Sequence, residues 1–180
     1  MPYEDIFFPS LDGTVLDGWF IPGTSDRLII CNHPMPCNRY GYPGHLEGFG
    51  QFGGFEVNFL PDYKHLHDAG FNVLAYDLCN HGRSAAGSGG IVAIGLLEYR
   101  DVIGSINYVR GRPDLTKMRL GLLSRCLGAN ATIVAMSKHP DHFKDVQAMV
   151  AVQPVSTCPF VQKALDGAGI DAVTGMALFD

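Results

Sequence analysis

The chain has 180 residues, of which 47% are hydrophobic and 17% are charged, and its formal net charge is -5. This length and composition indicate one ordered globular domain, and the negative charge argues against nucleic acid or an anionic membrane as the main partner. No apolar run is long enough to span a bilayer, and the acidic N-terminus lacks a basic and apolar signal region, so a cytoplasmic protein is expected.

Strands are expected at the start of the chain. Two segments with strand character, Ile6–Pro9 and Val15–Ile21, flank a turn that contains Asp12 and Gly13, and this arrangement predicts a hairpin. A short apolar segment, Leu28–Asn32, predicts a third strand. The first part of the chain is therefore expected to be strand-rich.

Helices and strands then alternate. A helix is expected at Pro61–Ala69, with a proline in its first turn and Gly70 as its stop, and a strand follows at Phe71–Tyr76. This alternation predicts an α/β fold, a mostly parallel sheet flanked by helices, in one domain that spans residues 1–180. The later expected elements are a helix with one face formed by Tyr99, Val102, Ile103 and Ile106, a strand at Met118–Leu123, a helix at Ala129–Ser137 and a strand at Val146–Val152.

Two long loops interrupt this pattern. Pro36–Leu60 interleaves glycines with aromatic residues, which favours a substrate-pocket wall, a lid or a subunit contact over plain disorder. Ala85–Gly90 is rich in glycine and is expected to be a flexible tip. A phosphate-binding loop is the alternative for this tip, but no Gly-Lys-Ser/Thr signature follows it.

The segment around Cys126 carries the most chemical information. An apolar run ending at Leu123 precedes the turn Ser124-Arg125-Cys126-Leu127-Gly128, and a helix pattern follows, so one nucleophile stands between a strand and a helix. Small residues flank this position if Cys126 is at the apex, whereas Leu122 would occupy a crowded position if Ser124 were. A helix N-terminus beside the sulfur stabilises a thiolate. The alternative interpretation is a buried, inert cysteine.

The other cysteines do not indicate a disulfide framework or a metal site. The five cysteines are an odd number without a Cys-X-X-Cys pair. Cys31, His33 and Cys37 lie close in sequence, but their spacing matches no established zinc pattern. No metal and no cofactor are therefore expected.

Three motifs in chain order resemble the α/β-hydrolase superfamily. The run from Leu28 to Met35, which contains His33 and Pro34, is similar to the strand and oxyanion turn of that fold. The segment from Val73 to Ser84 resembles its Tyr-Asp-X-X-Gly-His-Gly-X-Ser motif, and the turn at Cys126 then resembles its nucleophile elbow. The resemblance covers residues 5–155. Pro34 and Asn80 stand where the family has glycine, and cysteine replaces the usual serine, which is similar to the dienelactone hydrolases.

The resemblance implies specific roles. Cys126 is the expected nucleophile for acyl transfer, and the backbone N–H groups of Met35 and Leu127 are the expected oxyanion hole. His33 and His81 are the candidates for a substitute base, although the corresponding histidines in similar enzymes are structural. No Asp or Glu is identified as the acid of a triad.

Similar domains continue beyond the point that corresponds to Asp180. Two further strands in them are followed by loops that carry the acid and the base histidine, and no segment here matches either loop. We therefore expect the C-terminally incomplete, N-terminal two-thirds of the usual fold, with a homo-oligomer or a complementing chain as partner. The unpaired edge of Val146–Val152 favours such pairing.

The function that follows is a hydrolase or acyltransferase that acts on a small-molecule ester, thioester or lactone through Cys126. The main alternative is a catalytically silent α/β-hydrolase-like fragment or binding module, which the missing base favours. A redox-sensing thiol lacks an obvious resolving cysteine, and a nucleotide-binding protein lacks the phosphate-loop signature.

Overall fold

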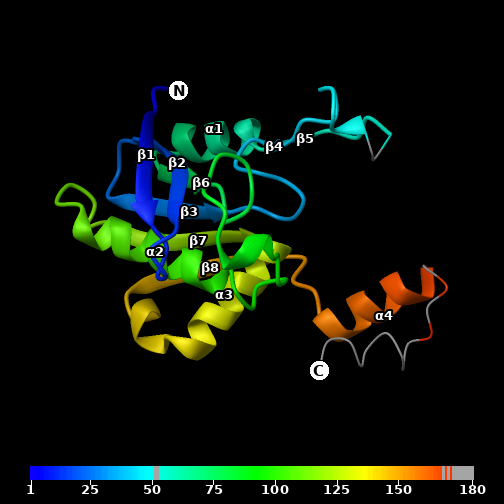
Figure 1. Cartoon of the computed structure of the whole chain (residues 1–180). Helices are drawn as coiled ribbons and strands as arrows, with labels where there is room; N and C mark the ends of the chain where they lie inside the picture. Colours follow the sequence, from blue (N-terminus) through cyan, green and yellow to red (C-terminus); the bar gives the residue numbers. More distant parts are fainter. Residues whose placement is uncertain (51–52, 168, 170, 172–180) are drawn as a thin grey trace.

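A six-stranded sheet forms the centre of the protein. The computed structural model describes residues 1–50, 53–167, 169 and 171, and Figure 1 shows the whole chain. The strand order in the sheet is β1-β2-β6-β3-β7-β8, and β4 and β5 form a separate two-stranded ribbon. The strands are β1 (Glu4–Pro9), β2 (Val15–Ile21), β3 (Arg27–Asn32), β4 (Gly41–Tyr42), β5 (Val57–Asn58), β6 (Asn72–Tyr76), β7 (Arg119–Arg125) and β8 (Val146–Val152).

The sheet is mixed, with a parallel part that positions the site. The hairpin β1–β2 and the pair β2–β6 are antiparallel, whereas β6, β3, β7 and β8 run parallel to their neighbours. Parallel strands end at the same edge of a sheet, and ligands in open α/β sheets bind outside that edge. The turns that follow β3, β6, β7 and β8 therefore meet in one region.

Helices cover both faces of the sheet. The α-helices are α1 (Leu60–Asp68), α2 (Tyr99–Gly111), α3 (Leu127–Lys138) and α4 (Thr157–Gly167), and two short 3₁₀ helices are η2 (Ser88–Gly90) and η3 (Pro140–Phe143). Leu74 and Tyr76 of β6 belong to the core beneath α2 and α3, while Val73 and Ala75 pack on the opposite face with Tyr63 of α1. Successive side chains of β6 point to opposite faces of the sheet, and helices cover both faces, so every residue of this strand is buried.

The last helix lies apart from the sheet. Figure 1 shows α4 to one side of the molecule, connected to β8 by a short segment. Among the residues that the structure describes, β8 is the final strand of the sheet, and Val150 and Val152 are exposed. No helix in the described ranges combines the length and apolar character needed to cross a bilayer.

Buried Asp101 makes stability depend on pH. Asp101 lies in α2 and accepts a hydrogen bond from the backbone N–H of Cys79 at 2.8 Å. Burial raises the pKa of Asp101 from 3.8 to about 7. Between these two pKa values the carboxyl group has lost its proton in the unfolded chain but keeps it in the folded protein. The free energy of unfolding therefore falls as the pH rises through this range. Above about pH 7 the group is ionised in both states, and its effect on stability no longer changes.

We expect Asp101→Asn to remove this dependence, because the amide keeps an acceptor for Cys79 and cannot ionise. Urea denaturation at a series of pH values measures it. The variant should gain stability relative to the parent as pH rises from about 4 to about 7, by about 1.4 kcal/mol for each unit of the pKa difference at most. A stability difference that stays constant over this range would contradict the assignment.

Candidate active site

Cys126 occupies a strained turn between β7 and α3. Its backbone has φ +47° and ψ −109°, a conformation that non-glycine residues rarely adopt. The Cys126 N–H donates to the carbonyl of Val152 at 2.8 Å, and the Gly128 N–H donates to the carbonyl of His33 at 3.1 Å. These bonds tie the turn to the ends of β8 and β3. The cysteine side chain, which is half-buried, stands at the apex of a strand–turn–helix elbow.

Ser124 faces the interior instead. Its hydroxyl accepts a hydrogen bond from Asn32 Nδ2 at 2.8 Å and lies 2.9 Å from the hydroxyl of Thr132. Tyr76 donates to Asn32 Oδ1 at 2.7 Å, so the polar groups below the elbow satisfy one another. Ser124 is fully buried. Its hydroxyl therefore supports the turn, and Cys126 is the side chain that the elbow presents.

Gly128 allows the elbow to approach β3. A Cβ atom at this position would lie 2.7 Å from the carbonyl carbon, carbonyl oxygen and Cβ of Asn32. Real Cβ atoms essentially never come so close to other heavy atoms, because the atoms would overlap. The small residue two positions after Cys126 is thus a steric requirement of this turn.

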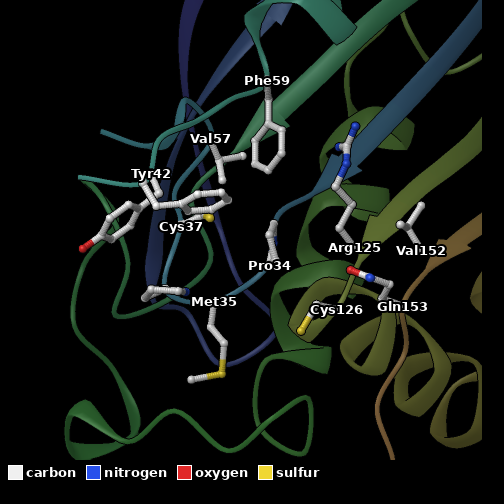
Figure 2. Close-up of a pocket in the computed structure, with 12 residues that line it drawn as sticks. Pro34, Met35, Cys37, Tyr42, Val57, Phe59, Arg125, Cys126, Val152 and Gln153 are labelled. Atoms are coloured by element: carbon white, nitrogen blue, oxygen red, sulfur yellow. The ribbon is translucent and has the colours of Figure 1, made fainter. Parts of the chain in front are cut away.

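An apolar cavity of about 680 Å³ opens beside Cys126. Figure 2 shows its side chains, which come from segments that lie far apart in the sequence. The walls are mostly apolar, so an apolar acyl or leaving group fits them. The lining residues are Pro34, Met35, Pro36, Cys37, Tyr42, Phe55, Val57, Phe59, Arg125, Cys126, Val152 and Gln153.

The long loop contributes one side of this cavity, as predicted for Pro36–Leu60. Tyr42, Val57 and Phe59 line the cavity from this segment, and the two strands β4 and β5 hold the ends of the loop together. Phe59 is buried, whereas Phe55 is largely exposed at the rim. Residues 51 and 52 lie outside the described residues, so the predicted contribution of Phe52 is not placed.

The two residues expected to supply the oxyanion donors lie next to Cys126 and at the wall of the cavity. Leu127 is the first residue of α3, and Met35 follows the end of β3 in the turn that lines the cavity. Within the described part of the chain, no protein acceptor takes the N–H of either residue. Unclaimed N–H groups at a helix N-terminus and an adjacent turn are the donors that stabilise a developing oxyanion.

His33 has no ring nitrogen available for a base. Its Nε2 accepts the N–H of Leu78 at 2.9 Å, and its Nδ1 donates to the carbonyl of Pro34 at 2.9 Å. Burial lowers the pKa of His33 to about 3. The ring is therefore neutral, and it joins the turn after β3 to the turn after β6. This geometry favours the structural role over the substitute base.

His81 is arranged differently. Its Nδ1 lies 2.9 Å from the carbonyl of Cys79 and donates to it, and its ring packs edge-on against His33, with centroids 5.1 Å apart. The Nε2 atom has no hydrogen-bond partner among the described residues. Of the two candidate bases, His81 is the one whose second nitrogen stays open.

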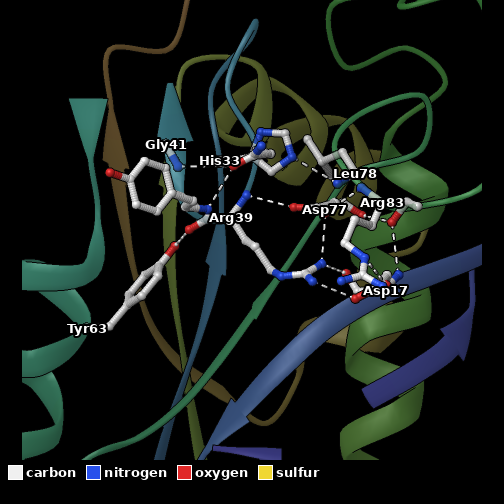
Figure 3. Close-up of polar contacts among 11 residues, drawn as sticks. Asp17, His33, Arg39, Gly41, Tyr63, Asp77, Leu78 and Arg83 are labelled. Atoms are coloured by element: carbon white, nitrogen blue, oxygen red, sulfur yellow. Dashed lines mark hydrogen bonds and ion pairs between the residues drawn. The ribbon is translucent and has the colours of Figure 1, made fainter. Parts of the chain in front are cut away.

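A buried charge network supports the same turns, as Figure 3 shows. Arg39 donates from Nη1 to Asp77 Oδ2 at 2.8 Å and from its backbone N–H to Asp77 Oδ1 at 2.7 Å. Its Nη2 lies 2.7 Å from Asp17 Oδ1. The Arg83 N–H adds a further bond to Asp77 at 2.8 Å, and Tyr63 donates to the Arg39 carbonyl. Asp77 therefore fixes the turns after β3 and β6.

Arg125 and Gln153 belong to the cavity but were not predicted from the sequence. Arg125 donates to Asp62 at 2.6 Å and its guanidinium lies 4.6 Å from the centre of the Phe59 ring. Gln153 follows β8 with φ +52°. Arg125 directly precedes Cys126, and Gln153 directly follows the next parallel strand, so the sequence offers a signal for both residues.

The remaining cysteines are less suited to nucleophilic attack. Burial raises the pKa of Cys31 to about 12 and the pKa values of Cys37 and Cys79 to about 11. Cys158 is exposed on α4. In the described residues, no group of three His, Cys, Asp or Glu side chains is arranged to hold a metal ion.

Comparison with known proteins shows which fold this is. No protein-family model matches the chain. The uncharacterised protein YfhR of Salmonella typhimurium is 32% identical over 133 residues, which is 74% of this chain and 40% of that protein. The chain therefore spans about two fifths of the length of such relatives.

Solved structures with the same arrangement include two hydrolases. The esterase Pf2001 of Pyrococcus furiosus superimposes with a TM-score of 0.67 and 23% identity, covering 92% of this chain and 56% of that chain. The α/β hydrolase GrgF of Penicillium sp. sh18 gives a TM-score of 0.65 and 20% identity, and the match covers 94% of this chain and 53% of that chain. At these identities the likeness concerns the fold, and it confirms the fold class that the three motifs predict.

Proposed function

The chain has the α/β-hydrolase fold, and from that premise we propose that it is a hydrolase or acyltransferase that uses Cys126 as a covalent nucleophile on an ester, thioester or lactone. The observation that carries the proposal is the position of Cys126. Its thiol stands at a strained elbow, at the N-terminus of α3, and opens into an apolar cavity. An inert core cysteine needs neither the strain nor the cavity.

The reaction follows from the geometry. The Cys126 thiolate attacks the carbonyl carbon of the substrate, and the N–H groups of Met35 and Leu127 stabilise the negative oxygen. Collapse of this intermediate expels the alcohol or thiol, which takes up a proton, and leaves a thioester on the sulfur. Water then attacks the thioester and releases the acid. Another alcohol or thiol in place of water gives acyl transfer.

Acylation and deacylation place different demands on a base. A thiol ionises in part near neutral pH, so it attacks without strong help from a base. Water is a poor nucleophile, and general-base assistance contributes about 10²–10⁴-fold to such a step. We propose that a residue from a complementing chain that pairs with β8 supplies this base, and that His81, which lines the neighbouring cavity and not the one beside Cys126, replaces it only weakly in the isolated chain. In the isolated chain, acylation should therefore be faster than deacylation.

The expected result is a burst. Mixing the purified chain with para-nitrophenyl butyrate should release about one nitrophenolate per chain quickly, followed by slow turnover, because the thioester accumulates. Stopped-flow absorbance measures both phases. The second candidate function, a catalytically silent binding module, is favoured by the engaged ring nitrogens of His33 and predicts no burst.

A further inference from the structure

A second cavity adjoins the first across the oxyanion turn. Its volume is about 630 Å³, and it shares Met35, Pro36 and Cys37 with the apolar cavity. Its other walls are far more polar and include Arg39, Arg83 and His81. A substrate bound at Cys126 therefore has an apolar chamber on one side of Met35 and a polar chamber on the other.

The polar chamber holds unused hydrogen-bond donors. Arg39 is only 4% exposed, and its Nε–H, which has no acceptor among the residues that the structure describes, is covered from the cavity by neighbouring atoms. The Arg83 side chain is 78% exposed and has one loose contact, 3.4 Å from its Nε to Asp17. In the same described residues, the amide nitrogen of Asn38 has no acceptor, because its bonds to Tyr40 and Gly41 use Oδ1.

The acceptors in this region are already occupied. Asp77 receives two bonds from Arg39 and one from the Arg83 backbone, and Asp17 faces the two guanidinium groups. Two arginines and two aspartates sum to no net charge. The chamber therefore offers donors without a large positive field, which suits one negative charge better than the two of a phosphate dianion.

We propose that the second cavity binds a carboxylate on the leaving group of the substrate. The inference rests on the proposed function, because it places the scissile carbonyl at Cys126 and the apolar acyl group in the first cavity. A carboxylate has two planar oxygens that match the fork of a guanidinium, and charge-assisted bonds of this kind are among the strongest. Arg83 supplies the fork, and the Asn38 amide adds a further donor.

The test compares two esters that differ only in this charge. One is the butyrate ester of para-hydroxyphenylpropionate, and the other is the butyrate ester of its methyl ester. We expect the chain to acylate faster with the charged ester. Arg83→Gln should lower the ratio of the two acylation rates by about tenfold, a change equivalent to about 1.4 kcal/mol. The matched control, Arg119→Gln, removes an exposed, ion-paired arginine that does not line this cavity and should leave the ratio unchanged.

A binding measurement separates this proposal from the proposed function. Calorimetry with Cys126→Ala and para-hydroxyphenylpropionate needs no catalysis, and it should show binding that Arg83→Gln weakens. If neither ester acylates the chain but this binding is found, the subsite stands and the hydrolase proposal fails. An unchanged ratio in Arg83→Gln, or the absence of carboxylate binding to Cys126→Ala, overturns the subsite.

Discussion

Cys126→Ala should abolish the burst of nitrophenolate while the protein stays folded. The covalent route begins at this sulfur, and removal of a catalytic nucleophile lowers rates by several orders of magnitude, about 10⁶-fold in well-studied hydrolases. The substitution removes one atom that lines a cavity, so the melting temperature measured by circular dichroism should change little. Stopped-flow absorbance with para-nitrophenyl butyrate measures the loss.

Two further variants sharpen this result. Cys126→Ser keeps a nucleophile of similar shape but one that is hardly ionised at neutral pH, so without a base it should also lose the burst. Cys158→Ala removes the exposed cysteine of α4, outside the cavity, and should keep the full burst. A burst that survives in Cys126→Ala, or that disappears in Cys158→Ala, is incompatible with the assignment.

Gly128→Ala should destabilise the protein and disturb the elbow. The new methyl group would lie 2.7 Å from backbone atoms of Asn32, so either β3 or the start of α3 must move. Overpacking of this kind costs about 1–3 kcal/mol. The shift also separates Leu127 from the turn that carries Met35, so the burst rate should fall. Urea denaturation gives the change in stability, and the stopped-flow assay gives the change in rate.

Gly111→Ala is the matched control, because a Cβ at this last residue of α2 meets no atom within 4 Å. We expect no loss of stability or burst rate in this variant. Should Gly128→Ala prove as stable and as fast as the parent, the close approach of the elbow to β3 would not matter for this protein.

Most of the fold could be predicted from local patterns. The strands at Val15–Ile21 and Val146–Val152 have the predicted bounds, and α1 and β6 differ from prediction by one residue. The start of α3 is the informative exception. The prediction places it at Ala129, after the turn Ser124–Gly128, but the helix begins at Leu127 directly after the strained apex.

Other elements depend on contacts that local patterns do not contain. The pairing of β4 with β5 joins Gly41 to Asn58 across the long aromatic loop, and each strand has only two residues. This pairing is not visible in a short window of sequence. The helix α4 is a different case, because it lies beyond the last expected element although its own residues form an amphipathic pattern.

The candidate site also contains residues that local motifs predict and residues that they do not. Cys126, Leu127 and Met35 could be proposed as site residues because each lies within a contiguous motif next to a predicted strand. The loop that contains Phe59 could be proposed as a pocket wall, but its meeting with Arg125 and Gln153 could not be predicted, because only the order of the sheet brings these residues together. The buried network of Arg39 with Asp17 and Asp77 is also non-local, although Asp77 itself lies in a predicted motif.

The location of the acyl group tests the central claim most directly. The reaction with para-nitrophenyl butyrate is quenched in acid at the end of the burst, and the peptides are mapped by mass spectrometry. The account predicts a butyryl group on the peptide that contains Cys126, removable by hydroxylamine as a thioester is. A butyryl group on Ser124, Cys37 or Cys158 instead, or no acylated peptide at all, would contradict it.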